Sequence, residues 1–292
     1  PLFVRMEHVV KFGANTFIWA SPFATATHLG LLDKAAAMGF DLLEVAVEDP
    51  ALIDVPTLRR AAAEAGVGVL VCGAFGPDRN LSSADTAVHQ QAADYLRWCI
   101  DAAAELGSPV VSGPMYSAVG KERLATAVAR QEEWQRAVAG LHQWGSYAQQ
   151  QGVRLALEPL NRFETDMINV VDQGLALLAE VDCDAVGLHL DTFHMHLEEK
   201  DSAAAIRRAG SRIYHVHACE NDRGIPGTGQ VNWPGVAQAL NEVGYDGAVV
   251  IESFTPEVQS IARAVCIWRE IAPDQDSIAA QGLAFLKSLL TD

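Results

Sequence analysis

The sequence lacks the features that mark disulfide-rich, zinc-ribbon or membrane proteins. Its five cysteines are scattered and form no C-x-x-C pair, which argues against a disulfide framework or a thiolate zinc site and favours a reducing compartment. No apolar run approaches the ~18 residues of a membrane span, and the first residues do not read as a signal peptide. These absences predict a cytoplasmic protein with no membrane partner.

Positive charge is also scarce. The chain has 21 Lys and Arg residues against 37 Asp and Glu residues, a net charge of −16. Nucleic acids and anionic membranes both attract Lys/Arg patches, so this balance disfavours them as partners. Half of the 292 residues are hydrophobic, as in an ordinary globular enzyme, and a small molecule is the expected partner.

What the sequence does contain is a strict alternation of apolar strands and amphipathic helices. Such alternation predicts a parallel sheet, and eight units in this length predict a (β/α)8 barrel, one domain over 1–292 with a helical C-terminal extension. An open doubly wound sheet is the alternative, but no G-x-G-x-x-G motif follows the first strand. The predicted strands are Lys11–Trp19, Asp41–Val47, Gly68–Gly73, Ser108–Ser112, Arg154–Glu158, Val186–Asp191, Ile213–Ala218 and Ala248–Glu252. The predicted helices are His28–Met38, Val55–Ala65, Thr86–Leu106, Arg130–Gln150, Asp172–Glu180, Ser202–Ala209, Pro234–Val243, Glu257–Arg269 and Ser277–Leu290.

The last four strands each end in a potential metal ligand: Glu158, Asp191, His217 and Glu252. Alone, each would more often be a cap, an ion-pair partner or a hydrogen-bonded core residue. Because the carboxyl ends of barrel strands meet at one mouth, the four together predict a shared cation.

The ligand types indicate which cation. Three carboxylates and one imidazole favour one Mn²⁺ ion, with Co²⁺ or Mg²⁺ as alternatives, over structural zinc. His215 precedes His217 by two residues and faces the same side of the strand. It is therefore a competing ligand or a residue that supports one.

Three polar residues follow these ligands at loop distance: Glu164, His194 and Arg223. Loops after barrel strands face the substrate, although each residue alone could be surface decoration. The sequence assigns no role to four further residues: Trp19, Phe75, Trp233 and Cys72.

Several segments carry a specific resemblance. LEPLNRFET, HLDTFHMHLEE, HVHACENDRGIPGTGQVNW and GYDGAVVIESF resemble the D-tagatose 3-epimerase and D-allulose (psicose) 3-epimerase family of the xylose-isomerase-like barrels. The match covers the second half in register and is weaker in the first, in ANTFIW, GFDLLEV and GPMYSA.

The resemblance implies a metal held by Glu158, Asp191, His217 and Glu252. It implies substrate contacts from Glu164, His194 and Arg223, and a homodimer or homotetramer. One departure stands out: the family often has Gly-Glu after the ligand histidine, where this chain has Ala218-Cys219 before Glu220.

The resulting hypothesis is a metal-dependent ketose 3-epimerase that acts on free ketoses through an ene-diolate. The substrate pairs expected are D-tagatose/D-sorbose, D-fructose/D-allulose or L-ribulose/L-xylulose. Glu158 and Glu252 would move the C3 proton on opposite faces of the substrate. The nearest rival is an aldose–ketose or hydroxypyruvate-type isomerase; a polyol dehydratase, a DNA-repair endonuclease and a sugar-binding module are further alternatives.

Overall fold

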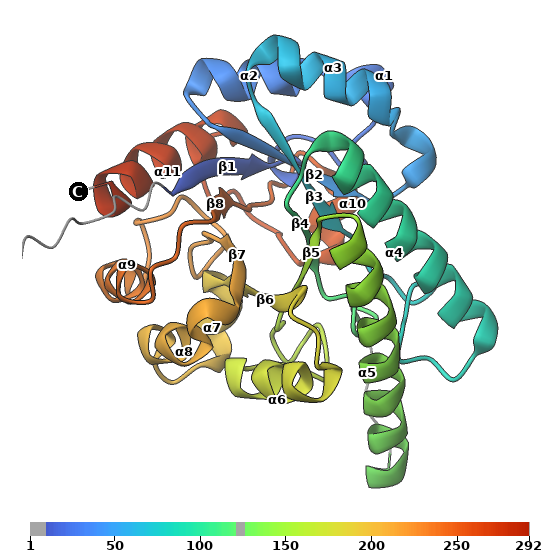
Figure 1. Cartoon of the computed structure of the whole chain (residues 1–292). Coiled ribbons are helices and arrows are strands. Elements are labelled where there is room, and N and C mark those ends of the chain that lie inside the picture. The colour runs from blue at the N-terminus through green and yellow to red at the C-terminus, as the bar shows by residue number, and fades with distance from the viewer. Residues whose placement is uncertain (1–9, 121–125, 292) are drawn as a thin grey trace, which may run out of the picture.

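The chain folds into a closed barrel of eight parallel strands in sequence order, ringed by helices (Figure 1). The computed structural model describes residues 10–120 and 126–291. The strands are β1 (Lys11–Asn15), β2 (Leu42–Val47), β3 (Gly68–Gly73), β4 (Val110–Gly113), β5 (Arg154–Leu157), β6 (Val186–Asp191), β7 (Ile213–His217) and β8 (Ala248–Ile251). The predicted fold class, a single-domain (β/α)8 barrel, is confirmed. The outer limits of the domain, 1–292, include residues outside the described part and stay a prediction.

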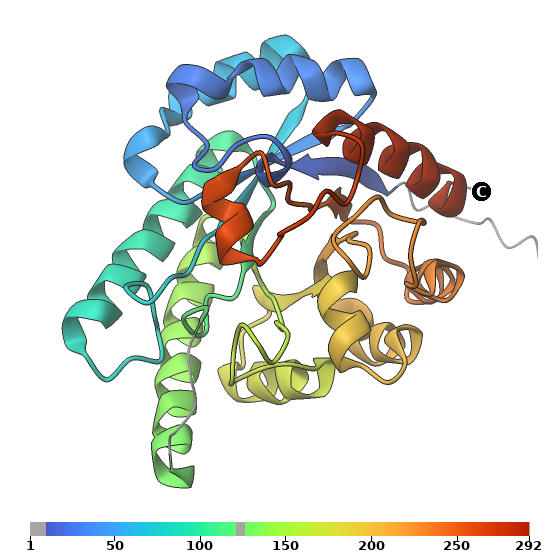
Figure 2. The same cartoon turned by 180° about the vertical axis from the view of Figure 1, so that it is seen from behind.

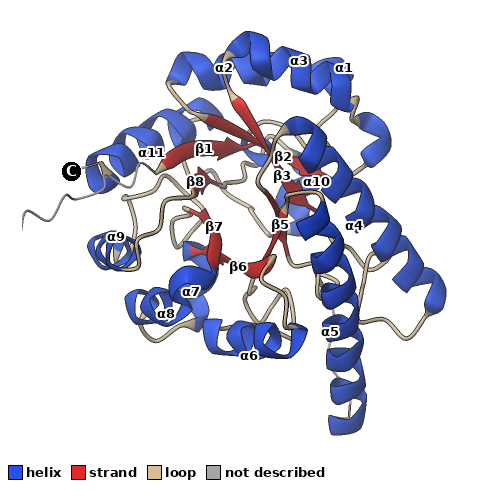
Figure 3. Cartoon of the chain, in the orientation of Figure 1, coloured by secondary structure: helices blue, strands red, loops and turns tan. Residues whose placement is uncertain are grey.

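The helices form the outer layer, with the strands inside (Figure 3). They are α1 (Thr25–His28), α2 (Gly30–Met38), α3 (Val55–Ala65), α4 (Thr86–Leu106), α5 (Ala127–Gln150), α6 (Val171–Val181), α7 (Thr192–Glu198), α8 (Ser202–Ala209), α9 (Trp233–Glu242), α10 (Gln259–Ala264) and α11 (Gln275–Leu290). The last of these, α11, packs against β1 and β8, where the barrel closes. None of the helices in the described ranges is long and apolar enough to cross a membrane.

Two predicted elements end earlier than the sequence pattern suggested. The strand predicted to reach Trp19 stops at Asn15, whose side chain accepts a hydrogen bond from the amide of Phe17 and starts the 3-10 turn η1 (Thr16–Ile18). The helix predicted over Glu257–Arg269 is reduced to α10, which lies at the end of the barrel seen in Figure 2. In both places the chain leaves regular structure near the mouth of the barrel.

The barrel interior changes from apolar to polar along the strands. A cluster of buried apolar side chains fills the part of the interior that lies further from the carboxyl ends of the strands: Leu42, Leu70, Val110, Ala156 and Val250. Alternate residues of a strand point to the same face, so the next inward-facing residues lie two positions further along each strand. These are Glu44, Cys72, Ser112, Glu158 and Glu252. The apolar layer is therefore a floor beneath a polar layer at the carboxyl ends of the strands.

Two glycines of α5 test how closely this helix packs on the barrel. A methyl group at Gly145 would lie 2.4 Å from a side-chain carbon of Val186, whereas one at Gly140 would meet Leu81 no closer than 3.6 Å. Gly145→Ala is expected to lower the free energy of unfolding by about 1–3 kcal/mol through overpacking. Gly140→Ala is the matched control and is expected to raise it by up to about 1 kcal/mol, because alanine favours the helix. Urea unfolding measures both; equal effects would contradict the close contact of α5 with β6.

Candidate metal centre

The barrel brings the four strand-end residues together. Glu158 follows β5, Asp191 and His217 end β6 and β7, and Glu252 follows β8. His217 Nδ1 lies 3.8 Å from Asp191 Oδ2 and 3.6 Å from Glu252 Oε1. Glu158 joins this group, since ligand atoms of Glu158, Asp191 and His217 all lie within 4.8 Å of one another.

The donor atoms fit a divalent cation. Nδ1 of His217 is buried and has no hydrogen-bond partner within the described residues. Three carboxylates lie beside it, and each of these residues is less than a tenth exposed. Burying carboxylates together is unfavourable unless a positive charge compensates them. Oxygen-rich donors with one imidazole suit Mn²⁺, Co²⁺ or Mg²⁺ better than structural zinc.

Asp191 has two functions in this arrangement. It ends β6 and caps α7, because its Oδ1 accepts hydrogen bonds from the amides of Phe193, at 2.6 Å, and His194, at 3.3 Å. Its other oxygen, Oδ2, remains directed to the cluster, 3.0 Å from Arg223 Nη1. The short helix α7 was not predicted from the sequence, and the capping interaction accounts for it.

Arg223 supplies the positive charge nearest to the carboxylates. Its Nη1 donates to Asp191 and, at 2.9 Å, to Oε2 of Glu252. The guanidinium carbon lies 4.0 Å from the ring centre of Phe193 and 5.0 Å from that of Phe254. These rings and the two carboxylates hold the guanidinium in one orientation.

The loop that carries Arg223 folds around the buried carboxylate of Glu220. This carboxylate accepts hydrogen bonds from the amides of Gly227 and Val231, each at 2.9 Å, and from the indole nitrogen of Trp233 at 2.8 Å. Arg223 itself adopts a left-handed backbone conformation, with φ at +64°. The loop therefore holds Arg223 in a conformation that a non-glycine residue rarely takes.

The two other predicted substrate contacts lie beside this cluster. His194 Nε2 is 3.7 Å from Glu158 Oε1 and 3.3 Å from Arg223 Nη2. The amide of Asn161 donates to His194 Nδ1 at 3.0 Å, which leaves the proton of a neutral ring on Nε2. Asn161 also donates, through its side chain, to Glu164 Oε1 at 2.8 Å. All seven predicted site residues thus lie at one end of the barrel, and their functional roles stay predictions.

The surroundings of the two candidate catalytic carboxyls shift their pKa values in opposite directions. Burial and the nearby carboxylate of Glu252 raise the pKa of Glu158 well above its usual range. Burial also opposes ionisation of Glu252, but His217 and Arg223 outweigh it and lower the pKa of this carboxyl. Two carboxyls whose pKa values shift in opposite directions are typical of an acid/base pair.

Among the residues that the sequence reasoning did not single out, Glu44 and Cys219 contact the candidate ligands. The Glu44 carboxylate is fully buried and lies 2.6 Å from His217 Nε2 and 2.8 Å from His215 Nε2. His215 therefore lies beside Glu44, and its role as a competing ligand or a supporting residue stays a prediction. The thiol of Cys219 donates to Asp191 Oδ2 at 3.2 Å and to the carbonyl of Glu252 at 2.9 Å. A charged residue inside the apolar run LLEVAV was the available signal for Glu44.

The residues to which the sequence assigned no role mainly pack. The Trp19 indole donates to Asp276 at 2.7 Å, and Phe75 contacts Tyr95 edge to face at 5.3 Å between ring centres. Trp233 is buried and bonded to Glu220. Cys72 is buried in the barrel interior, next to Glu44.

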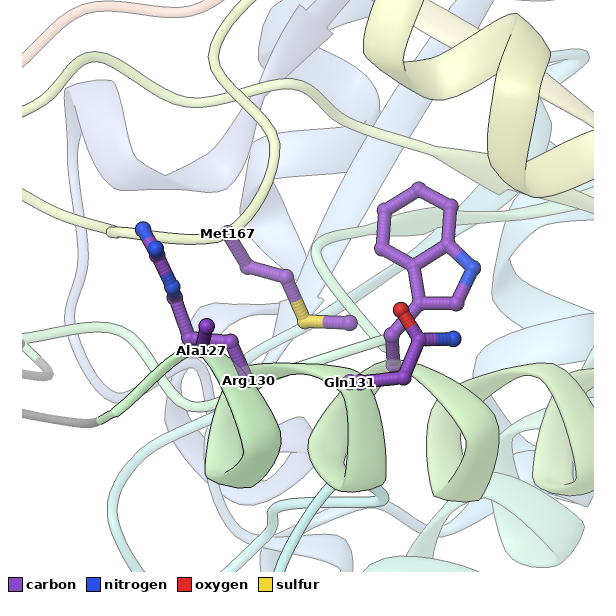
Figure 4. Close-up of a pocket in the computed structure, with 5 residues that line it drawn as sticks. Ala127, Arg130, Gln131 and Met167 are labelled. Atoms are coloured by element: carbon purple, nitrogen blue, oxygen red, sulfur yellow. The ribbon is translucent and has the colours of Figure 1, made fainter.

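A separate hollow lies on the outside of the barrel. Met167 reaches from a loop toward α5, which contributes Ala127, Arg130, Gln131 and Trp134 (Figure 4). Among the described residues that line it, there is no predicted site residue and no carboxylate or imidazole group. The strand-end cluster is therefore the candidate site.

Comparisons with known proteins match most of the chain. The family model of the xylose isomerase-like TIM barrel matches residues 32–289. L-ribulose 3-epimerase of Mesorhizobium japonicum is 33% identical over 95% of this chain and 93% of its own length. Ketose 3-epimerase of Arthrobacter globiformis is 34% identical over 97% of both chains.

A solved structure extends the likeness to three dimensions. D-allulose 3-epimerase from Methylomonas sp., in complex with D-allulose, superposes with a TM-score of 0.91 at 30% identity and covers 96% of this chain and 97% of its own. Since the family model spans most of the chain and these relatives match nearly all of it, the chain belongs to the xylose isomerase-like TIM barrels and, within them, to the ketose 3-epimerase family of isomerases.

Proposed function

We propose that the chain interconverts C3 epimers of a free ketose through an ene-diolate, with one divalent cation held by Glu158, Asp191, His217 and Glu252. The substrate pair would be of the D-tagatose/D-sorbose, D-fructose/D-allulose or L-ribulose/L-xylulose type. The observation that carries the proposal is the meeting of Glu158 and Glu252, from β5 and β8, in one buried cluster. A cation bound there, Mn²⁺ by preference, would stabilise negative charge on the substrate's C2 and C3 oxygens.

The two glutamates suit a transfer of the C3 proton from one face to the other. Each is 7% exposed, whereas Asp191 is 1% exposed and His217 is fully buried. Glu158 and Glu252 are therefore the ligands best placed to reach a substrate above the cluster. In one direction of the reaction, the carboxylate of Glu252 would take the C3 proton on one face, while the carboxyl of Glu158 returns a proton on the opposite face. In the reverse direction the two exchange roles.

The remaining residues orient the sugar. His194 Nε2–H and Arg223 Nη2, 3.3 Å apart, present donors side by side that can hold the oxygens at C1 and C2. Glu164, fixed by Asn161, can accept a hydrogen bond from an adjacent hydroxyl. Assembly as a homodimer or homotetramer and a cytoplasmic location stay predictions.

A test in D₂O identifies the reacting carbon. Mn²⁺-loaded protein is incubated with a panel of free ketoses, and the products are separated and examined by NMR. The expected result is a C3 epimer with deuterium at C3, while substrate recovered early still carries protium there, because different carboxylates remove and deliver the proton. An aldose product with exchange at C1 would replace the proposal with the aldose–ketose or hydroxypyruvate-type isomerase.

A further inference from the structure

The buried carboxylate of Glu44 is the least expected charge in the barrel. It lies in the middle of β2 and is 0% exposed. The candidate metal ligand that it contacts, His217, is 173 residues away in the sequence. A buried charge is retained only where several groups compensate it. It lies in the polar layer that also contains Glu158 and Glu252, which links it to the cluster rather than to the apolar floor.

Four groups surround this carboxylate. The side-chain amide of Asn15 donates to Oε2 at 2.8 Å, and the hydroxyl of Ser112 donates to Oε1 at 3.1 Å. The imidazoles of His215 and His217 approach the same two oxygens, at 2.8 Å and 2.6 Å. Residues of β1, β4 and β7 thus hold Glu44 in position.

An ionised carboxylate can only accept hydrogen bonds. The short contact with His217 Nε2 therefore requires a proton on that nitrogen. With Nε2 protonated, a neutral His217 ring carries its lone pair on Nδ1, the buried atom that has no partner within the described residues and faces Asp191 and Glu252. The contact selects one tautomer and one ring orientation.

We propose that Glu44 is a positioning residue that presents His217 Nδ1 to the cation and sets the affinity of the centre. This inference rests on the proposed metal centre, and it adds a residue that the sequence pattern of strand ends does not contain. Carboxylates in this relation to a ligating histidine typically account for a 10–100-fold difference in metal affinity. Glu44 acts through His217 and does not itself touch the cation or the sugar.

The test compares Mn²⁺ affinity, by calorimetry on demetallated protein, among wild type, Glu44→Gln and Glu48→Gln. Glu48 follows the same strand, is half-buried, and accepts a hydrogen bond from the Ser21 hydroxyl at 2.8 Å rather than from an imidazole. Glu44→Gln is expected to weaken Mn²⁺ binding roughly 10–100-fold, whereas Glu48→Gln leaves it unchanged. Equal affinities of wild type and Glu44→Gln would overturn the inference. A wild type that binds no divalent cation would instead overturn the proposed function.

A second measurement does not depend on whether Glu44→Gln folds. In ¹⁵N-histidine-labelled wild type loaded with Mg²⁺, the His217 ring is expected to carry its proton on Nε2, with the resonance identified by its loss in His217→Gln. A proton on Nδ1 in the loaded protein would overturn the inference. Thermal melting of the demetallated proteins separates an effect on stability from the effect on affinity.

Discussion

Replacing either Glu158 or Glu252 by Gln is expected to lower the rate of C3 epimerisation by roughly 10²–10⁴-fold, the usual contribution of a general acid or base. Gln keeps the size of the side chain and one oxygen donor but cannot take or give the proton. The two residues follow β5 and β8 and differ in the direction of their pKa shifts. Loss of either carboxylate should therefore stop proton transfer on one face of the substrate and leave proton transfer on the other face.

Hydrogen exchange in D₂O distinguishes this account from simple loss of the centre. Each variant is expected to exchange the C3 hydrogen of one epimer without turnover, and the two variants should exchange opposite epimers. Metal content is measured in parallel, because the exchange result tests the two carboxylates only in variants that keep their metal. Glu242→Gln is the control, since Glu242 is an exposed partner of Arg207. Substantial epimerisation by Glu158→Gln with its metal bound would remove Glu158 from the mechanism.

The sequence was sufficient to predict the barrel because each strand is a short apolar run followed by a helix. The same simplicity made the strand-end ligands visible: Glu158, Asp191 and Glu252 are charges that terminate buried runs. The structure brings them together with His217, as the parallel barrel requires. What could be predicted is thus the part of the site that depends on the order of strands alone.

The residues that were missed depend on closure of the barrel. Glu44 reaches His217 only because β1 pairs with β8 and brings the two ends of the sheet together. In one dimension, Glu44 resembles a charge on the exposed face of a strand. Cys219 was noted only as a departure from a family pattern, and its contact with Asp191 depends on the turn after β7. Both contacts are between residues far apart in sequence, which local periodicity does not encode.

The short helices illustrate a second limit. The helix α7 has seven residues, too few for a hydrophobic period to identify, and it starts because Asp191 caps it. A capping role and a ligand role are chemically compatible, since the two oxygens of one carboxylate serve them separately. The sequence showed the carboxylate of Asp191, but not that one oxygen caps α7 while the other faces the cluster.

Removal of the divalent cation is expected to abolish turnover and to lower thermal stability together. Without the cation, three carboxylates share a buried cluster in which Arg223 is the nearest counter-charge. An ion that binds the folded but not the unfolded chain stabilises the fold by about 4 kcal/mol when the free ion is at 1,000 times its Kd. Dialysis against a chelator should therefore lower the melting temperature by several degrees or more, and Mn²⁺ or Co²⁺ should restore both stability and activity.

Asp191→Asn tests the same centre by changing a candidate ligand instead of removing the cation. The change removes a negative charge that faces both the cation site and Arg223, so we expect loss of most of the metal and of the metal-dependent rise in melting temperature. Asp172→Asn is the matched control, because Asp172 is an exposed carboxylate paired with Arg208 on the outer helices. Full turnover by wild-type protein that elemental analysis finds free of divalent metal would contradict a catalytic cation. A normal metal content in Asp191→Asn would remove Asp191 from the ligand set and leave the other three residues to be tested in the same way.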